Sequence, residues 1–118
     1  MYEYRAKLDR VVDGDTVDVI IDLGFGITLG SDKLPKRVRL YGINTPETRT
    51  RDLAEKALGL AAKARVEELL ADGQLIVRTQ KDNTGKYGRL LGEIINSDGI
   101  NINDQLLSEG HAVEYMKG

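Results

Sequence analysis

One long helical pattern, covering residues 52–71, lies between two groups of strand patterns and limits the folds open to this chain. Its apolar residues recur at three- and four-residue spacing and form one helix face, made of Leu58, Ala61, Ala62, Val66, Leu69 and Leu70. Asp52 is suited to cap the helix N-terminus, and Gly73 follows the C-terminal end. A single long helix among strands is typical of an α+β domain.

Strand patterns precede and follow this helix. Three segments before it, residues 2–12, 16–23 and 37–43, are rich in β-branched residues or alternate polar and apolar side chains. After the helix come two further strands, a short helix, and an end segment that fits either a strand or an extended tail, at residues 74–79, 89–95, 103–109 and 112–115. This order favours a mainly β fold, a five-stranded OB-fold barrel with the long helix between strands 3 and 4 and a short C-terminal helix.

A turn is predicted at residues 23–26, where two glycines permit positive φ angles. The turn contains Phe25, the single phenylalanine of the chain. We expect this side chain to close one end of the barrel, and stacking on a nucleobase is the alternative.

The length of 118 residues corresponds to one domain, which we expect to span residues 1–118. The absence of cysteine excludes zinc–thiolate sites, iron–sulfur clusters and thiol catalysis. No apolar run is long enough to cross a membrane, and the first seven residues lack the apolar stretch of a signal peptide. We therefore expect a monomer without membrane attachment, and a cytoplasmic location unless the chain has been trimmed.

The net charge of −2 is unevenly distributed along the sequence. Residues 33–51 hold six basic side chains and one acid, and residues 78–89 hold four basic side chains and one acid. The rest of the chain is correspondingly acidic. A local basic field can hold a phosphate chain whatever the total charge, although two solvated surface loops would give the same pattern.

Asp13 and Asp15 flank Gly14 at the junction of the first two strands. Carboxylate oxygens suit a hard cation, and a glycine lets the backbone bend around one. An ordinary hairpin turn has the same composition, so this motif alone is weak evidence for a metal site.

Two further motifs contain residues suited to bind a metal ion or a phosphate. The segment Asn44-Thr45-Pro46-Glu47 follows the third strand and supplies an amide oxygen, a backbone carbonyl and a carboxylate. The segment Lys86-Tyr87-Gly88-Arg89 places two cations and an aromatic ring at a loop end. A simple strand exit and a surface hairpin would account for the same residues.

Taken together, these motifs and their order around the helix resemble the staphylococcal nuclease family. The resemblance rests on Asp-Gly-Asp-Thr at 13–16, Arg39, Asn-Thr-Pro-Glu-Thr at 44–48 and Lys-Tyr-Gly-Arg at 86–89, and it extends from about Ala6 to Val113. It implies an OB barrel with helices and a nuclease that uses Ca²⁺ to hydrolyse DNA and RNA, cutting the bond to the 5′ oxygen and leaving 3′-phosphate ends. Its partners would be DNA and RNA, with single-stranded or frayed regions preferred.

The resemblance also implies a metal site. The ligands would be the Asp15 carboxylate, the Asn44 side chain and the backbone carbonyl of Thr45. Asp13 would lie next to these ligands and would not bind the ion directly. Asn44 is neutral where an acid is usual in this family, so we expect weak metal binding, because ligand charge is one of the factors that set calcium affinity.

The same resemblance implies the residues that act on the substrate. Arg39 and Arg89 would hold the scissile phosphate, and Glu47 would activate or orient the attacking water. A guanidinium suits this task because its planar fork matches two phosphate oxygens. Contacts to the nucleotide or a neighbouring phosphate would come from Lys86, Tyr87 and Tyr115.

Two functions are compatible with these features. A metal-dependent phosphodiesterase needs Asp15, Arg39, Glu47 and Arg89, and all four are present. A catalytically impaired OB-type nucleic-acid-binding module is the alternative, because such domains keep the barrel without the catalytic set. About ten additional residues between 23 and 36 are a further departure from the family pattern.

Overall fold

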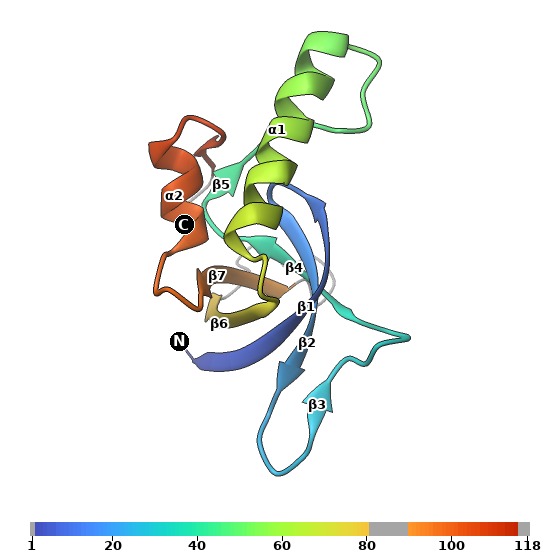
Figure 1. Ribbon diagram of the computed structural model, residues 1–118, viewed down its shortest axis with the longest axis vertical. Helices are drawn as coiled ribbons and strands as arrows, with labels where there is room; N and C mark the ends of the chain where they lie inside the picture. The colour runs from blue at the N-terminus through green and yellow to red at the C-terminus, as the bar shows by residue number, and fades with distance from the viewer. Residues whose placement is uncertain (1, 81–89, 116–118) are drawn as a thin grey trace.

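Five strands close into a barrel in the computed structural model, which describes residues 2–80 and 90–115 (Figure 1). The strands are β1 (Glu3–Asp13), β2 (Thr16–Asp22), β4 (Lys36–Leu40), β6 (Gln74–Gln80) and β7 (Leu90–Asn96). Their order is β1-β6-β7-β4-β2, and β2 pairs back onto β1 to complete the ring. The β4–β7 pair is parallel and the other pairs are antiparallel. The predicted OB-type barrel is therefore confirmed.

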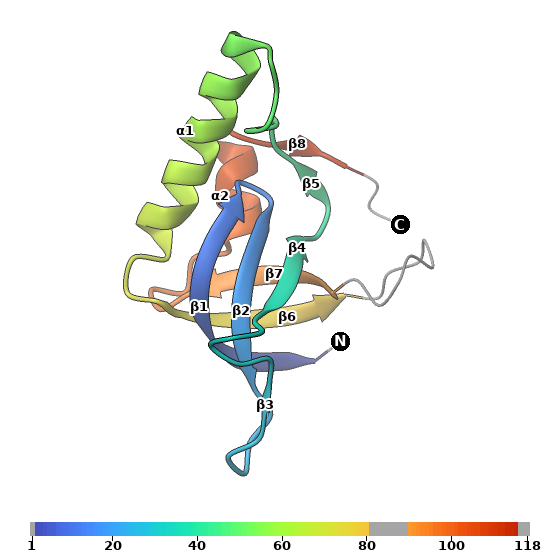
Figure 2. The same cartoon turned by 90° about the vertical axis from the view of Figure 1, so that its right-hand side faces the viewer.

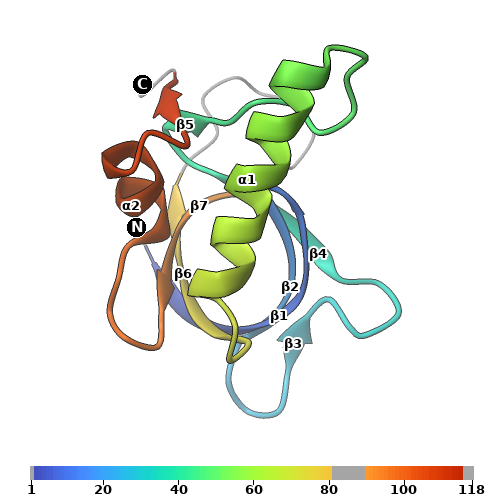
Figure 3. The same ribbon diagram turned by 45° about the horizontal axis from the view of Figure 1, so that its top comes forward.

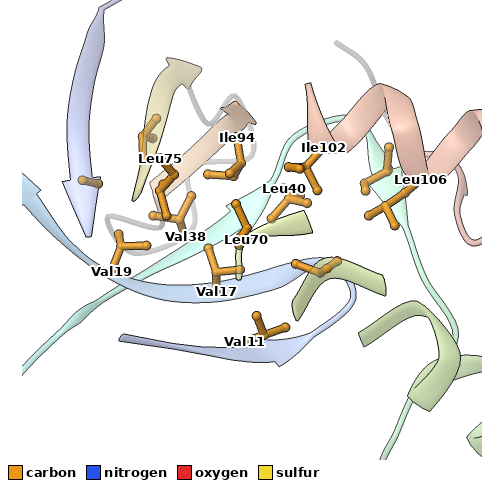
Figure 4. Close-up of a cluster of buried hydrophobic side chains, with 14 of the residues drawn as sticks. Val11, Val17, Val19, Val38, Leu40, Leu70, Leu75, Ile94, Ile102 and Leu106 are labelled. Atoms are coloured by element: carbon orange, nitrogen blue, oxygen red, sulfur yellow. The ribbon is translucent and has the colours of Figure 1, made fainter. Parts of the chain in front are cut away.

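Alternation along the strands builds the core. Val17 and Val19 of β2 and Val38 and Leu40 of β4 point inward and are almost completely buried. Asp18 and Arg39, which lie between them, point to the outside of the barrel, where Asp18 is buried against Arg10 and Arg37. Figure 4 shows these side chains close to Ile94 of β7, Leu70 at the C-cap of the long helix, and Ile102 and Leu106 of the short helix near the C-terminus. Truncating one such buried Leu or Ile to Ala costs about 2–5 kcal/mol of stability.

The long helix α1 (Leu53–Leu69) covers one end of the barrel (Figure 3). Asp52 caps it as predicted, accepting hydrogen bonds from the backbone N–H groups of Ala54 and Glu55. The predicted apolar face is wrong in part, because Leu58 and Ala61 are exposed. The buried face is narrower and consists of small side chains, Gly59, Ala62 and Val66, followed by Leu70 at the C-cap. Within the described residues, no helix is long and apolar enough to cross a membrane.

The strand predicted over residues 37–43 is interrupted. Gly42 adopts a φ of 78°, which ends β4 and starts the short strand β5 (Ile43–Asn44). The predicted end segment is a strand, β8 (Val113–Glu114), which pairs with β5. The buried side chain of Asn103, in α2 (Ile102–Ser108), stabilises this break by donating to the carbonyl oxygens of Tyr41 and Gly92.

Residues 23–35 include a hairpin that extends beyond the barrel (Figure 2). A short strand, β3 (Thr28–Leu29), pairs with the end of β2 and was not predicted. Phe25 lies at the hairpin tip with a φ of 56° and a fully exposed side chain. The expectation that Phe25 closes the barrel end is therefore wrong, because the additional residues carry it away from the core.

Candidate active site

The turn between β1 and β2 places Asp15 beside the loop that follows β5. Asp15 is only 9% exposed, and its two carboxylate oxygens have different partners. Oδ1 accepts a hydrogen bond from the Thr16 hydroxyl at 3.0 Å, and Oδ2 accepts one from the Thr45 backbone N–H at 3.2 Å. These bonds hold the carboxylate in one orientation against the segment that carries Asn44 and Thr45.

Gly14 permits this approach because it has no side chain. A Cβ atom at this position would lie 2.8 Å from the Ala62 Cβ of α1 and 3.0 Å from two Thr45 side-chain atoms. The backbone turns at residues 14–15 as expected, but Gly14 is not among the residues with positive φ, so the bend itself does not require a glycine. Close packing of the turn against α1 and Thr45 is what requires a glycine here.

Arg39 extends from β4 to the same place. Its NH1 atom lies 3.1 Å from Asp15 Oδ2, and its NH2 group donates to Asn44 Oδ1 at 3.3 Å. The guanidinium also lies over the Tyr115 ring, with its central carbon 5.5 Å from the ring centroid. The Tyr115 backbone N–H donates to the Gly42 carbonyl, so the β5–β8 pairing brings this tyrosine to the site. A guanidinium over an aromatic face gains a favourable cation–π interaction.

Glu47 lies two residues beyond Thr45 on an exposed loop. The Glu47 residue is exposed, and among the described residues its carboxylate has no hydrogen-bond or ion-pair partner. The loop itself packs tightly on α1, because a Cβ on Gly59 would lie 2.7 Å from the carbonyl oxygens of both Pro46 and Glu47. Asp13 restrains the same loop by accepting a hydrogen bond from the Thr48 hydroxyl. Backbone packing and the Asp13–Thr48 bond therefore position Glu47.

The structure thus brings together five of the residues singled out from the sequence, which are Asp15, Arg39, Asn44, Thr45 and Tyr115. Asp13 and Glu47 flank this cluster through the Thr48 loop. Arg89, Lys86 and Tyr87 lie outside the described residues, and their predicted roles stay predictions.

Comparison with known proteins gives the family. Residues 37–117, which include the Asn44–Thr48 loop, match the family described as staphylococcal nuclease homologue. The chain belongs to the staphylococcal nuclease family. It is similar to endonuclease YncB of Bacillus subtilis, with 35% identity over 95% of this chain and 49% of the relative. It is also 34% identical to endonuclease YhcR of the same organism, over 97% of this chain and 9% of that protein, and 33% identical to thermonuclease of Staphylococcus intermedius, over 87% and 55%. The chain therefore spans about half of YncB and of thermonuclease and a small part of YhcR.

The cation expected for this family can be tested against the donors present. The ligands expected from the sequence are all oxygen atoms, from the Asp15 carboxylate, the Asn44 amide and the Thr45 carbonyl, and hard cations such as Ca²⁺ prefer such ligands. The structure brings the Asp15 and Asn44 side chains and the Thr45 backbone together at Arg39. The Thr45 hydroxyl is a buried polar atom without a partner among the described residues, so it can still form a hydrogen bond with a bound group. No group of three or more His, Cys, Asp or Glu side chains that could hold a metal occurs in residues 2–80 and 90–115. These donors fit a hard cation such as Ca²⁺, which they would hold weakly because Asp15 would be their single carboxylate.

Sequence reasoning missed three residues that position the site. Thr48 could have been identified because it belongs to the Asn-Thr-Pro-Glu-Thr motif. Gly59 interrupts the apolar face of the predicted helix, which could have indicated close packing. Asn103 has no sequence signal, because its partners are backbone groups of β7 and of Tyr41, which lies 62 residues earlier in the chain.

Proposed function

We propose that this chain hydrolyses the phosphodiester bonds of DNA and RNA. The observation that carries the proposal is the contact of Arg39 with both Asp15 and Asn44 beside Thr45, which gathers one guanidinium and a set of oxygen donors at one end of β4. A phosphodiester is anionic and repels nucleophiles, so a site that cleaves it must supply positive charge where charge develops. Membership of the staphylococcal nuclease family, which includes the relatives named thermonuclease and endonuclease, supports the same reaction.

In this proposal Arg39 binds the scissile phosphate. A guanidinium has five N–H donors, so contacts with Asp15 and Asn44 leave donors for phosphate oxygens. Arg89 is proposed as the second phosphate ligand. Glu47, exposed on its restrained loop, accepts a proton from water or aligns that water for attack. Because water is the nucleophile, the reaction does not need a 2′-hydroxyl, and both DNA and RNA are substrates.

The proposal includes Ca²⁺ bound by Asp15, Asn44 and the Thr45 carbonyl. When bound, the ion would neutralise phosphate charge as a Lewis acid. Asp15 is oriented for this role by its bonds to Thr16 and Thr45, and Asn44 adds an oxygen without adding charge. We further propose that the bond to the 5′ oxygen is the one cut, which leaves 3′-phosphate ends.

The test is digestion of single-stranded DNA and RNA by the purified chain with Ca²⁺, Mg²⁺ or EDTA. We expect cleavage with Ca²⁺, none with EDTA, and product 3′ ends that a polymerase extends only after phosphatase treatment. Glu47→Gln should reduce the rate by about 10²- to 10⁴-fold, the usual contribution of a general base. Arg65→Gln, which alters an ion pair between α1 and the end of α2, is the matched control and should cut normally. Undiminished cleavage in EDTA would contradict the cation, and equal rates for Glu47→Gln and the parent would contradict the role of Glu47.

The alternative function, binding without cleavage, has one observation in its favour. Asn44 leaves the proposed cation with a single direct carboxylate, which weakens the driving force for binding it. In that case the chain would bind oligonucleotides but release no product even at millimolar Ca²⁺. The digestion experiment above therefore separates the two functions directly.

A further inference from the structure

A second charged cluster lies on the outer surface of the barrel, across β1, β2 and β4. Asp18 of β2 receives hydrogen bonds from two arginines on the neighbouring strands. Arg37 donates from Nε to Oδ1 at 3.0 Å and from NH2 to Oδ2 at 3.3 Å, and Arg10 donates from Nε to Oδ2 at 3.2 Å. The strand register explains the contact, because Asp18 is directly opposite Arg10 on β1 and Arg37 on β4.

The acid in this cluster is buried and the two bases are exposed. The Asp18 side chain is 7% exposed, whereas those of Arg10 and Arg37 are 60% and 58% exposed. Burial opposes ionisation of Asp18, but the hydrogen bonds from Arg37 and Arg10 outweigh it and lower its pKa. Asp18 is therefore a fixed anion that holds two guanidinium groups at the surface. Within the described part of the chain, both terminal nitrogens of Arg10 and NH1 of Arg37 have no hydrogen-bond partner.

The cluster is continuous with the candidate active site. Arg37 and Arg39 are two residues apart on β4 and project from the same face, since Val38 between them points into the core. Two residues of a strand span about 7 Å, similar to the separation of neighbouring phosphates along an extended nucleic acid strand. Figure 2 shows β1, β2 and β4 side by side below β5, with the start of β4 toward the β3 hairpin and its end toward β5. Going from Arg39 to Arg37 along β4 therefore leads toward the β3 hairpin.

A hollow of about 500 Å³ lies at the far end of this path. Its lining includes Arg10, Arg37 and Lys33, together with Asp9 and Asp18. Three bases against two acids leave a charge of +1, in a protein whose net charge is −2. A single arginine would be enough to neutralise Asp18, so the second arginine and Lys33 are not explained by the burial of that carboxylate.

We propose that Arg37, Arg10 and Lys33 form a binding track for the phosphate backbone of a single-stranded nucleic acid that leads away from Arg39. This inference rests on the proposed function for the identity of the ligand. The track adds contacts to phosphates remote from the scissile bond, so it raises affinity for long substrates and leaves very short ones unaffected. Arginine suits such a surface because its fork binds phosphate oxygens while Asp18 holds it in place.

Binding is measured by fluorescence anisotropy with labelled oligothymidylates of about 3 and about 12 nucleotides, lengths below and within the usual site size of an OB fold. Every protein carries Glu47→Gln, so that cleavage does not remove the probe. In this background the double variant Arg10→Gln/Arg37→Gln should bind the long probe about 10-fold more weakly, because two phosphate contacts are lost. Its slope of log K against log salt should be smaller by about 1.4, at about 0.7 for each contact to a single strand. Affinity for the short probe should stay unchanged.

Two further variants separate the track from damage to the fold. Arg65→Gln also removes an ion-paired arginine, but on α1, and should leave both probes unaffected. Asp9→Asn removes an acid from the hollow and should strengthen binding of the long probe, a gain that misfolding cannot produce. Any of three results would overturn the track. The parent could bind both probes equally well, the double variant could bind the long probe as well as the parent does, or the double variant could lose the same affinity for both probes. Length-dependent binding by a chain that cuts nothing would instead overturn the proposed function and leave the track in place.

Discussion

Arg39 is the residue on which most contacts of the candidate site converge. It joins Asp15 to Asn44 and lies over Tyr115, so one guanidinium contacts a carboxylate, an amide and an aromatic ring. Its side chain is 19% exposed, so a substrate can reach it while the protein still holds it in place. A group positioned before the substrate arrives loses little freedom on binding, which favours transition-state stabilisation.

Replacing Arg39 with Lys should separate charge from geometry. The ammonium group keeps a positive charge near Asp15 but cannot bond Asp15, Asn44 and a phosphate in a fixed planar fork. We expect kcat/KM to fall on the order of 10²-fold, as for removal of one preorganised donor, while the thermal midpoint changes little. The same substitution at Arg65 should leave activity intact. A near-parental kcat/KM for Arg39→Lys would remove Arg39 from the phosphate site.

Asn44 is the residue that should set the calcium requirement. Changing Asn44 to Asp adds a second carboxylate beside Asp15 and close to Arg39, so we expect a lower midpoint for activation by Ca²⁺. The added charge also opposes phosphate binding, so the measurement is the calcium midpoint at saturating substrate. Gln74→Glu adds the same charge at the start of β6 and should leave the midpoint unchanged. An unchanged midpoint in Asn44→Asp would mean that Asn44 does not bind the ion.

At the scale of elements, α1 acts as a support for the catalytic loop. Gly59 and Ala62 let the helix backbone approach the Thr45–Glu47 segment and the Asp13–Asp15 turn. Both segments belong to the candidate site, so the helix sets their separation without supplying a reacting side chain. This explains why the buried face of α1 consists of small residues, a pattern that hydrophobic periodicity alone does not detect.

Gly59→Ala tests this support. Alanine at a helical position is normally more stable than glycine by about 1 kcal/mol. Here the new methyl group would lie 2.7 Å from two backbone carbonyls, so we expect net destabilisation by about 1–3 kcal/mol and a loss of kcat as the Glu47 loop shifts. Ala57→Gly is the control: at this exposed position of α1 it changes helix propensity without affecting any contact with the Glu47 loop, so kcat should stay unaltered. A stabilised Gly59→Ala protein with full activity would show that the loop accommodates the helix.

The elements also show which features the sequence could predict. Periodicity predicted where the barrel strands and the long helix lie along the chain, and local chemistry predicted the Asp52 cap. The order of the strands in the barrel was expected from the family resemblance. The break at Gly42 was not predicted, because residues 37–43 were treated as one alternating strand, although Ile43 is out of phase with Val38 and Leu40. The motifs identified Asp15, Arg39, Asn44 and Thr45, but the contact between Arg39 and Asp15 depends on how two strand ends meet. The Arg10–Asp18–Arg37 cluster likewise depends on register across three strands, which a linear pattern does not contain.

At the scale of the whole molecule, several acids on different surfaces depend on basic or hydroxyl partners. Hydrogen bonds from Arg65 and Gln105 lower the pKa of Glu109 to about 2. The Arg65–Glu109 ion pair links α1 to the end of α2. The pKa of Asp72 is lowered by its hydrogen bond from Ser97, and that of Asp18 is lowered by its arginines despite burial. Each of these acids favours the folded state only while it is ionised.

The resulting pH dependence has a definite sign. A carboxylate whose pKa is lower in the folded than in the unfolded protein stabilises the fold above the unfolded value of about 4, and this contribution is lost as pH falls through the folded value. We therefore expect a nearly constant thermal midpoint from pH 7 to about 5 and a progressive fall between about 4.5 and about 2, the window set by Glu109.

Arg65→Gln removes the largest cause of the lowered pKa of Glu109, so its thermal midpoint should be lower at pH 7 and fall less steeply in acid. Arg51→Gln removes the same charge from the exposed loop before α1 and should follow the parental curve. Thermal unfolding followed by circular dichroism across this range decides the matter, and an acid-independent midpoint, or identical slopes for Arg65→Gln and the parent, would contradict the role of these ion pairs.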